Sequence, residues 1–200
     1  MVHHGETDPR AKVAYKRLYD AHSTHIHNLP DNVVAALGRY TGTGYSVINH
    51  ALAAGTDIPD IAKIDSAFEG DGSRLPNSVK LRRGMATNNL LAGLGLVPED
   101  LAGDKVGTLV GRVYTEKVYA STTLDVKRVM HFSQAAKKGK TTLFINAPKG
   151  SKALFLGGAA SEHGNELEVL LPRDSKMLIT SAKRSQSSGG SVVVLTVDLL

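Results

Sequence analysis

The chain has 200 residues, of which 42% are hydrophobic and 22% charged, and its formal net charge is +5. This length and composition support one domain with a packed core and exclude a disordered tail. The absence of cysteine excludes disulfides, thiol catalysis and cysteine-ligated zinc, and no stretch approaches the roughly 20 apolar residues that span a bilayer.

The first third of the chain is expected to be helical. Its first helix would place four apolar or aromatic side chains on one face, namely Val13, Tyr15, Leu18 and Tyr19. The second would open with Pro30 and Asp31, which favour helix starts, and the third would close at Gly55. The expected helices cover residues 8–22, 29–42, 44–55 and 56–70.

From Val79 onward the pattern changes to strands, in short runs rich in Val, Leu, Ile and Thr between Gly, Pro and Ser. The expected strands cover residues 78–84, 117–123, 141–148, 152–158, 166–172, 175–184 and 191–200, and one helix, 124–139, interrupts them. Helices first and strands later indicate an α+β fold. We expect a single domain over residues 1–200, with a helical part at about 8–78 and a mainly β core at about 79–200.

Two short motifs are weak indicators of a ligand site. GTGYS, residues 42–46, lacks the preceding strand and the full spacing of a dinucleotide-binding loop. HSTHIH, residues 22–27, offers three imidazoles without a second ligand cluster, so we expect a polar loop there and no metal.

The stretch NELEVLLPR opens an otherwise apolar run with two acids, Glu166 and Glu168. Side chains two residues apart on a strand point to the same side, so the two carboxylates are expected side by side. Two interpretations are open: a solvated strand end, or a carboxylate pair in which one acid stabilises positive charge and the other handles a proton.

Two other strand ends carry polar groups that could share a cleft with these acids. KLRRGM places Arg82 and Arg83 at the end of one strand, and YASTT places Ser121, Thr122 and Thr123 at the end of another. An arginine, then a hydroxyl cluster, then Glu-x-Glu resembles the pattern of mono-ADP-ribosyltransferases of the arginine–serine–glutamate group.

The resemblance extends beyond these motifs. LGRYTGTGYSVIN is similar to a helical segment of binary actin-modifying toxins, and APKGSKALFLGG and NELEVLLPRDSKMLI follow the same group in order and spacing. The similar region runs from about residue 30 to residue 179. The resemblance implies N-terminal helices followed by two packed, mainly antiparallel β-sheets around an NAD cleft, with NAD as co-substrate.

The family's chemistry implies roles for the site residues. These enzymes cleave NAD between nicotinamide and ribose through a transition state resembling an oxocarbenium ion, which nearby negative charge stabilises. By resemblance, Glu168 binds the ribose 2′-hydroxyl and supports that cation, and Ser121 holds Glu168 by a hydrogen bond. Glu166 orients the nucleophile and helps remove its proton. Arg83 pairs with the pyrophosphate, and versions of the motif with two arginines favour Arg82 instead.

Further positions match residues that contact NAD in the family: Tyr40, Tyr45, Asn49, Arg82, Gly84, Thr122, Thr123 and Phe132. Helix or core packing is the alternative for the aromatic residues and Asn49. Thr123 stands where the family has serine, and Ala135 stands where some relatives carry an arginine. In the loop GGAASEHGN, His163 lies three residues before the first acid, and the resemblance implies that it contacts the acceptor; a solvent-exposed loop histidine is the alternative.

The resemblance implies mono-ADP-ribosylation of a target protein on arginine, by a monomeric toxin, effector or phage enzyme in the cytosol of a target cell. Water as acceptor would make the chain an NAD glycohydrolase, and the net positive charge keeps a nucleic-acid acceptor open. An aromatic content of 5% without Trp weakens single-strand binding by base stacking. A catalytically inactive binding domain is disfavoured because every named polar residue is present.

The start MVHHGETDPR shows no apolar signal region, and no membrane partner is expected.

Overall fold

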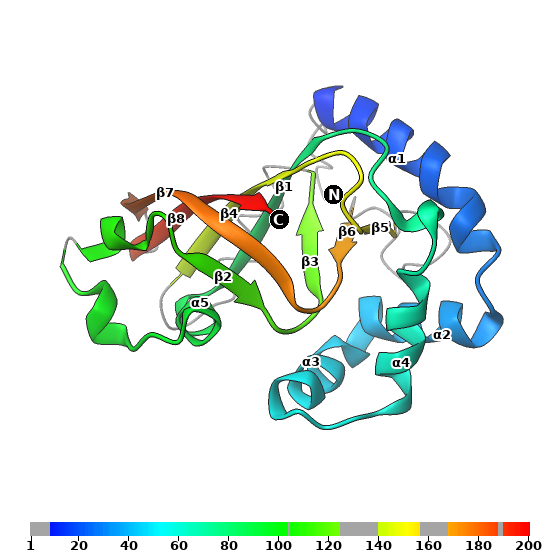
Figure 1. Cartoon of the computed structure of the whole chain (residues 1–200), viewed down its shortest axis with the longest axis horizontal. Coiled ribbons are helices and arrows are strands. Elements are labelled where there is room, and N and C mark those ends of the chain that lie inside the picture. The colour runs from blue at the N-terminus through cyan, green and yellow to red at the C-terminus, as the bar shows by residue number, and fades with distance from the viewer. Residues whose placement is uncertain (1–8, 104, 125–139, 157–167, 188–189) are drawn as a thin grey trace, which may run out of the picture.

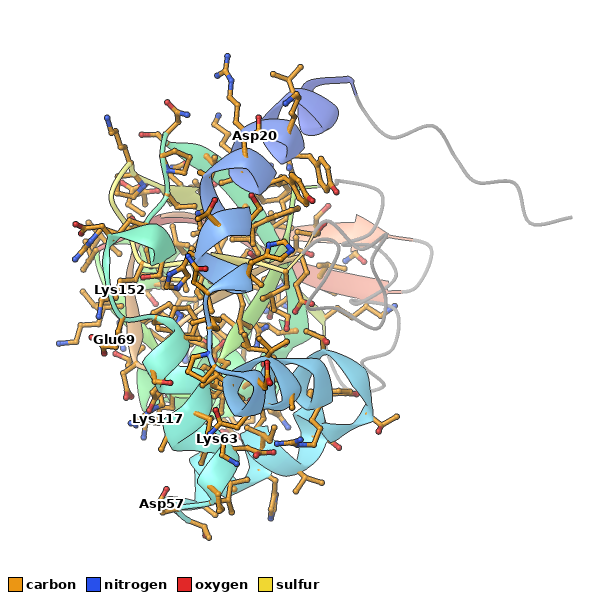
Figure 2. All side chains as sticks on the ribbon, turned by 90° about the vertical axis from the view of Figure 1, so that its right-hand side faces the viewer. Asp20, Asp57, Lys63, Glu69, Lys117 and Lys152 are labelled. Carbon is orange, nitrogen blue, oxygen red and sulfur yellow. The ribbon has the colours of Figure 1, made fainter. Side chains whose placement is uncertain are left out.

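The computed structural model describes residues 9–103, 105–124, 140–156, 168–187 and 190–200. Its N-terminal part is helical and consists of α1 (Pro9–His27), α2 (Asp31–Arg39), the π-helical turn η1 (Tyr40–Gly44), α3 (Tyr45–Ala54), α4 (Pro59–Ala67) and the 3₁₀ turn η2 (Asp71–Ser73). Helices α1 to α4 lie together on one side of the strands (Figure 1), and Figure 2 views the molecule from that side. None of the helices in these ranges is long and apolar enough to cross a membrane.

The second part is mainly β and confirms the expected α+β class. Its strands are β1 (Val79–Ala86), β2 (Val113–Glu116), β3 (Ala120–Thr123), β4 (Lys140–Ala147), β5 (Leu154–Phe155), β6 (Glu168–Leu171), β7 (Ser175–Ser187) and β8 (Gly190–Leu199). Between β1 and β2 lie α5 (Thr87–Leu94) and the 3₁₀ turns η3 (Pro98–Leu101) and η4 (Lys105–Leu109).

The strands form one hydrogen-bonded order, β2-β7-β8-β4-β1-β3-β6-β5, where two sheets were expected. Only the β4–β8 pairing is parallel, so the sheet is mainly antiparallel, as expected. The two halves join at β1 and β3 through a single residue pair, Arg82 opposite Thr123. Strand β1 otherwise pairs with β4 along its whole length, and this narrow junction gives the two halves different directions (Figure 1).

Strand β6 is buried on both faces, which explains why its sequence does not alternate between apolar and polar residues. Val169 and Leu171 belong to the apolar cluster formed mainly by the strands and α5. Leu170, between them, belongs to a second cluster that α2, α3 and α4 build against the sheet. The strand therefore runs between two layers, and its first residue, Glu168, lies where they meet.

The HSTHIH segment corrects the sequence expectation of a polar loop, because α1 continues through it to His27. His25 Nε2 lies 2.8 Å from the Ala67 carbonyl oxygen at the end of α4. A Cβ added at Gly72 would lie 2.7 Å from the His25 Cβ, so the turn after α4 fits closely over this helix. These tertiary contacts extend the helix beyond the expected end at residue 22. The expected helix 124–139 lies almost wholly outside the described residues.

One described α-helix, α5, and one described strand, β2, were not expected from the sequence. Each is short, and each is fixed by tertiary packing. Leu90 and Leu91 of α5 are buried, and the helix ends at Gly95 in a left-handed conformation with φ +66°. Strand β2 pairs with β7 over four residues.

The helix expected over residues 29–42 is interrupted at η1. Gly42 there has non-helical backbone angles, φ −89° and ψ −129°. A Cβ at Gly44 would lie 2.7 Å from the Arg39 carbonyl oxygen, so only glycine fits this close turn. Interruptions of this π type are frequent at functional sites, and this one turns Tyr40 toward the sheet.

We expect His22 to make the fold sensitive to acid. This α1 side chain is buried, and its Nδ1 accepts a hydrogen bond of 3.2 Å from the Phe155 backbone N–H. Burial lowers the pKa of His22 from 6.5 to about 4, and a backbone contact with Arg74 only partly offsets this. The unfolded chain therefore takes up the proton first as the pH falls. The stability is fully present above the unfolded pKa and is lost between pH 6.5 and about 4.

Protonation of His22 should lower the free energy of unfolding by on the order of 3 kcal/mol over that pH range. Urea denaturation at several pH values measures it. In His22→Asn, the amide oxygen can replace Nδ1 as acceptor but does not titrate, so the pH dependence should flatten. His27→Asn, at an exposed position of the same helix, is the control. An unchanged pH profile in His22→Asn would contradict the assignment.

Candidate active site

A cavity of about 460 Å³ lies at the junction of the two sheet halves, beneath η1 and α3. Strands β1, β3 and β6, the helical turn η1, and helices α3 and α5 all contribute to its walls. The lining residues are Tyr40, Thr41, Gly42, Tyr45, Asn49, Arg82, Arg83, Gly84, Met85, Asn89, Ser121, Thr122, Thr123 and Glu168.

Three of these residues are level with one another across adjacent strands. Arg82 on β1 is the register partner of Thr123 on β3, and Thr123 is the register partner of Glu168 on β6. Arg82 and Glu168 are two strand spacings apart, so their Cα atoms are separated by roughly 10 Å. The site thus holds a cation and a carboxylate at a fixed separation, with a hydroxyl between them.

Glu168 is a buried carboxylate, only 8% exposed. Ser121 lies two residues before Thr123 on β3, so both hydroxyl side chains are on the same face of the strand as Glu168. Thr122 points to the other face, and its hydroxyl donates a hydrogen bond to the Val169 carbonyl oxygen, which ties β3 to β6.

Both arginines are anchored by backbone carbonyls, one within β3 and one directly after it. Arg83 Nη1 donates to the Ser121 carbonyl oxygen over 3.0 Å, and Arg82 Nη1 donates to the Leu124 carbonyl oxygen over 2.9 Å. Arg83 also forms an ion pair with Glu116 of β2, with 3.1 Å between Nε and Oε2. Its N–H does not point directly at that oxygen, so the contact is electrostatic rather than an aligned hydrogen bond. Both cations reach the cavity with donors still available.

Tyr40 forms the wall opposite the strands. It is buried, its hydroxyl donates to the Tyr119 carbonyl oxygen over 3.0 Å, and Asn49 Nδ2 donates to that hydroxyl over 3.3 Å. Burial raises the pKa of Tyr40, and the nearby charge of Arg83 opposes the shift. The hydroxyl is therefore a neutral, fixed group. Tyr45, in contrast, is 56% exposed at the mouth of the cavity.

Several residues around the cavity have a buried polar atom without a hydrogen-bond partner. Within the described ranges, four buried side-chain nitrogen or oxygen atoms have no hydrogen-bond partner. Three of them belong to residues that line this cavity: Asn49 Oδ1, Arg82 Nε and Arg83 Nε. Buried polar atoms are rarely left unpaired in proteins, so this concentration marks the surroundings of the cavity as polar, and Arg83 Nε among them faces the Glu116 carboxylate.

A family model for the ADP-ribosyltransferase exoenzymes matches residues 18–200. The chain belongs to this family. A protein from Mycobacterium avium (strain 104) whose name describes an NAD(+)–arginine ADP-ribosyltransferase, Mav, is 25% identical over 173 residues. That match covers 86% of this chain but only 18% of Mav, so the chain spans less than a fifth of the length of this relative.

Solved toxin structures share the ADP-ribosyltransferase fold of the chain. Plx2a, an ADP-ribosyltransferase toxin from Paenibacillus larvae, superposes with a TM-score of 0.75 at 22% identity and 96% coverage of both chains. C3stau2 from S. aureus, solved with NAD, gives 0.70 at the same identity and coverage. The toxin BECa of C. perfringens, solved with NADH, gives 0.72 at 22% identity, covering 94% of this chain and 48% of BECa.

The structure brings together ten of the site residues that the sequence indicated: Tyr40, Tyr45, Asn49, Arg82, Arg83, Gly84, Ser121, Thr122, Thr123 and Glu168. Phe132, His163 and Glu166 lie outside the described residues. Both arginines line the cavity, so their relative importance stays a prediction. The described part of the chain contains no group of three or more metal-ligating side chains.

Several residues of the candidate site were not indicated by the sequence. Thr41, Gly42, Met85 and Asn89 line the cavity, and Glu116 contacts Arg83 from behind it. Thr41 and Gly42 stood within the quoted segment LGRYTGTGYSVIN, and Met85 within KLRRGM. No local signal pointed to Asn89 or Glu116, because one lies on the unexpected helix α5 and the other on the unexpected strand β2.

Proposed function

We propose that this chain is an NAD-dependent mono-ADP-ribosyltransferase that transfers ADP-ribose to an arginine side chain of a target protein. The observation that carries the proposal is the cavity in which Arg82, Thr123 and Glu168 lie level across three strands. A dinucleotide with an anionic pyrophosphate and a cationic nicotinamide riboside has charges complementary to such a site.

Three features support NAD as the ligand. Arg82 and Arg83 both line the cavity, and guanidinium groups suit phosphate oxygens. Glu168 provides negative charge where positive charge on the ribose would develop. Two toxins that share the fold were solved with NAD or NADH.

In the proposed reaction, Glu168 accepts a hydrogen bond from the ribose 2′-hydroxyl and stabilises positive charge on the anomeric carbon. The bond from that carbon to the nicotinamide nitrogen breaks, and its electron pair leaves with nicotinamide. A guanidinium nitrogen of the target arginine then bonds to the carbon, and its proton passes to Glu166. Ser121 holds Glu168 in position, and the arginines hold the pyrophosphate.

Arginine as the acceptor is supported by the name of the relative Mav and by the Glu-x-Glu order of the acids. An acid at the first position can pair with a guanidinium, whereas an amide at that position could not remove its proton. Water as acceptor would use the same cavity and is the alternative outcome of the experiment below.

The test compares nicotinamide release from NAD without an acceptor, with polyarginine and with polylysine. We expect polyarginine alone to accelerate release and to gain the mass of ADP-ribose. A target-cell cytosolic extract incubated with isotopically labelled NAD should then yield modified arginine peptides by mass spectrometry. Nicotinamide release that no acceptor accelerates would indicate an NAD glycohydrolase. Labelled ADP-ribose on nucleic acid would indicate a nucleic-acid acceptor. If no nicotinamide is released at all, the proposal is refuted.

We also propose that His163 helps to seat the target protein and takes little part in cleavage of NAD. His163→Ala should lower modification of the target about fivefold to tenfold, because truncation of an interface residue that carries binding energy costs about 1 kcal/mol or more. Nicotinamide release without target should be nearly unchanged. A variant that loses both activities together, or neither, contradicts this role. His50→Ala, an exposed histidine on α3, is the control.

A further inference from the structure

Glu116 is a buried acid that lies behind the candidate site and does not line its cavity. It ends β2, which is separated from β1 by three strands in the order of the sheet. Its carboxylate nevertheless lies 3.1 Å from Arg83 of β1, because the sheet curves and brings the end of β2 in front of β1 (Figure 1). The contact therefore joins two strands that are not neighbours in the hydrogen-bonded order of the sheet.

Tyr114 fixes the position of this carboxylate. Its hydroxyl donates to Glu116 Oε2 over 2.8 Å, and this is the same oxygen that faces Arg83. The Tyr114 ring in turn is held against α5, since a Cβ added at Gly93 would lie only 2.2 Å from it. Burial, and then the charge of Glu116, raise the pKa of Tyr114, so the hydroxyl remains a donor.

Burial of the Glu116–Arg83 ion pair costs free energy, because both charges lose their hydration. Such a pair is therefore weak evidence for stability and suggests another role. The Glu116 and Arg83 side chains are only 6% and 12% exposed. The opposite side of the guanidinium is anchored by the Ser121 carbonyl oxygen. Arg83 is thus held by Glu116 of β2 and by the Ser121 carbonyl oxygen of β3. Its other N–H donors remain available to a ligand.

We propose that Glu116, supported by Tyr114, is a positioning residue that aligns Arg83 with the anionic group of the substrate dinucleotide. This inference rests on the proposed function for the identity of that substrate. Glu116 itself touches neither the substrate nor the reacting atoms. Its role is to fix one guanidinium orientation before binding, so that binding does not have to restrict a long side chain.

The role predicts a loss of affinity and not of turnover. In Glu116→Gln, the Kd and the KM for NAD should rise tenfold or more, because a misaligned Arg83 loses its hydrogen bond to the anionic group, and hydrogen bonds to charged groups contribute about 1.5–3 kcal/mol. The kcat for nicotinamide release should change less than about threefold, because Glu168 is untouched. Calorimetric titration with NAD gives the Kd without any chemistry, and a thermal melt of each variant reports folding.

Asp65 provides a matched control in the same molecule. Its carboxylate also faces an arginine and a tyrosine hydroxyl, with 2.9 Å to Arg173 Nη2 and 2.7 Å to Tyr119 Oη, but it does not line the cavity. Asp65→Asn should lower the melting temperature and leave the KM for NAD within about twofold of the wild type, since its loss is structural. Both variants exchange a carboxylate for its amide beside an arginine and a tyrosine hydroxyl, and the Asp65 pair lies away from the cavity and is more exposed.

A double-mutant cycle with Arg83→Gln decides whether Glu116 acts through Arg83. In that background, Glu116→Gln should raise the KM no further, because there is no guanidinium left to position. Additive effects would overturn the inference, and so would a Glu116→Gln variant that melts earlier with an unchanged KM. If Glu116→Gln alone does not fold, two other variants keep the test possible. The double variant leaves no unpaired buried charge. Tyr114→Phe removes only one hydroxyl and should raise the KM by about twofold to fivefold. An unchanged KM in Tyr114→Phe would then count against the role. Wild-type protein that neither binds nor cleaves NAD refutes the proposed function instead, which separates the two failures.

Discussion

Replacing Glu168 with Gln should lower nicotinamide release and ADP-ribose transfer by about 100-fold to 1,000-fold, because electrostatic support of a charged transition state is commonly worth several kcal/mol. The substitution keeps the size of the side chain and removes its charge. Glu168 is only 8% exposed, so water screens that charge weakly and its loss is felt in full. The measurement is the single-turnover rate of nicotinamide release at saturating NAD.

Binding of NAD by Glu168→Gln should weaken far less than the rate, because the positive charge on the ribose develops mainly in the transition state. Glu69→Gln is the matched control, since Glu69 lies exposed on the surface beyond α4 (Figure 2). A Glu168→Gln variant with near-normal turnover would remove Glu168 from the chemistry. Equal losses in Kd and in rate would assign it to ground-state binding.

Replacing Glu166 with Gln should separate the two halves of the reaction. Transfer to arginine should fall about 100-fold or more, because general-base catalysis and alignment of a bulky nucleophile are both lost. Hydrolysis of NAD should fall less than about tenfold, since water needs little orientation. The measurement compares nicotinamide release without acceptor with the mass gained by polyarginine under the same conditions.

The comparison between the two acids makes this result informative. Equal loss of transfer and hydrolysis in Glu166→Gln would show that Glu166 serves cleavage of NAD, as we propose for Glu168. Full retention of arginine transfer would remove Glu166 from the acceptor side altogether. Glu168→Gln, which should lose both activities, is the reference for each outcome.

Local patterns predicted much of this molecule, because they depend on neighbours in the chain. Apolar spacing and helix-opening residues indicated the N-terminal helices, and short β-rich runs indicated seven of the eight described strands. The motif residues on three of those strands were named from the sequence, and ten of the predicted site residues line one cavity. The order of these motifs was enough to indicate the family, whose model matches residues 18–200.

The tertiary structure alone decided how distant segments meet. The pattern around Tyr40 indicated a continuous helix, but the close approach of Gly44 to Arg39 turns the chain there and brings Tyr40 into the cavity wall. HSTHIH has the composition of a loop, yet burial of His22 against β5 and the fit of His25 beside α4 keep it helical. Glu116 and Arg83 are 33 residues apart and on non-adjacent strands, and only the curvature of the sheet joins them. Such contacts depend on packing between layers, and that packing leaves no periodic signal in the sequence of either segment.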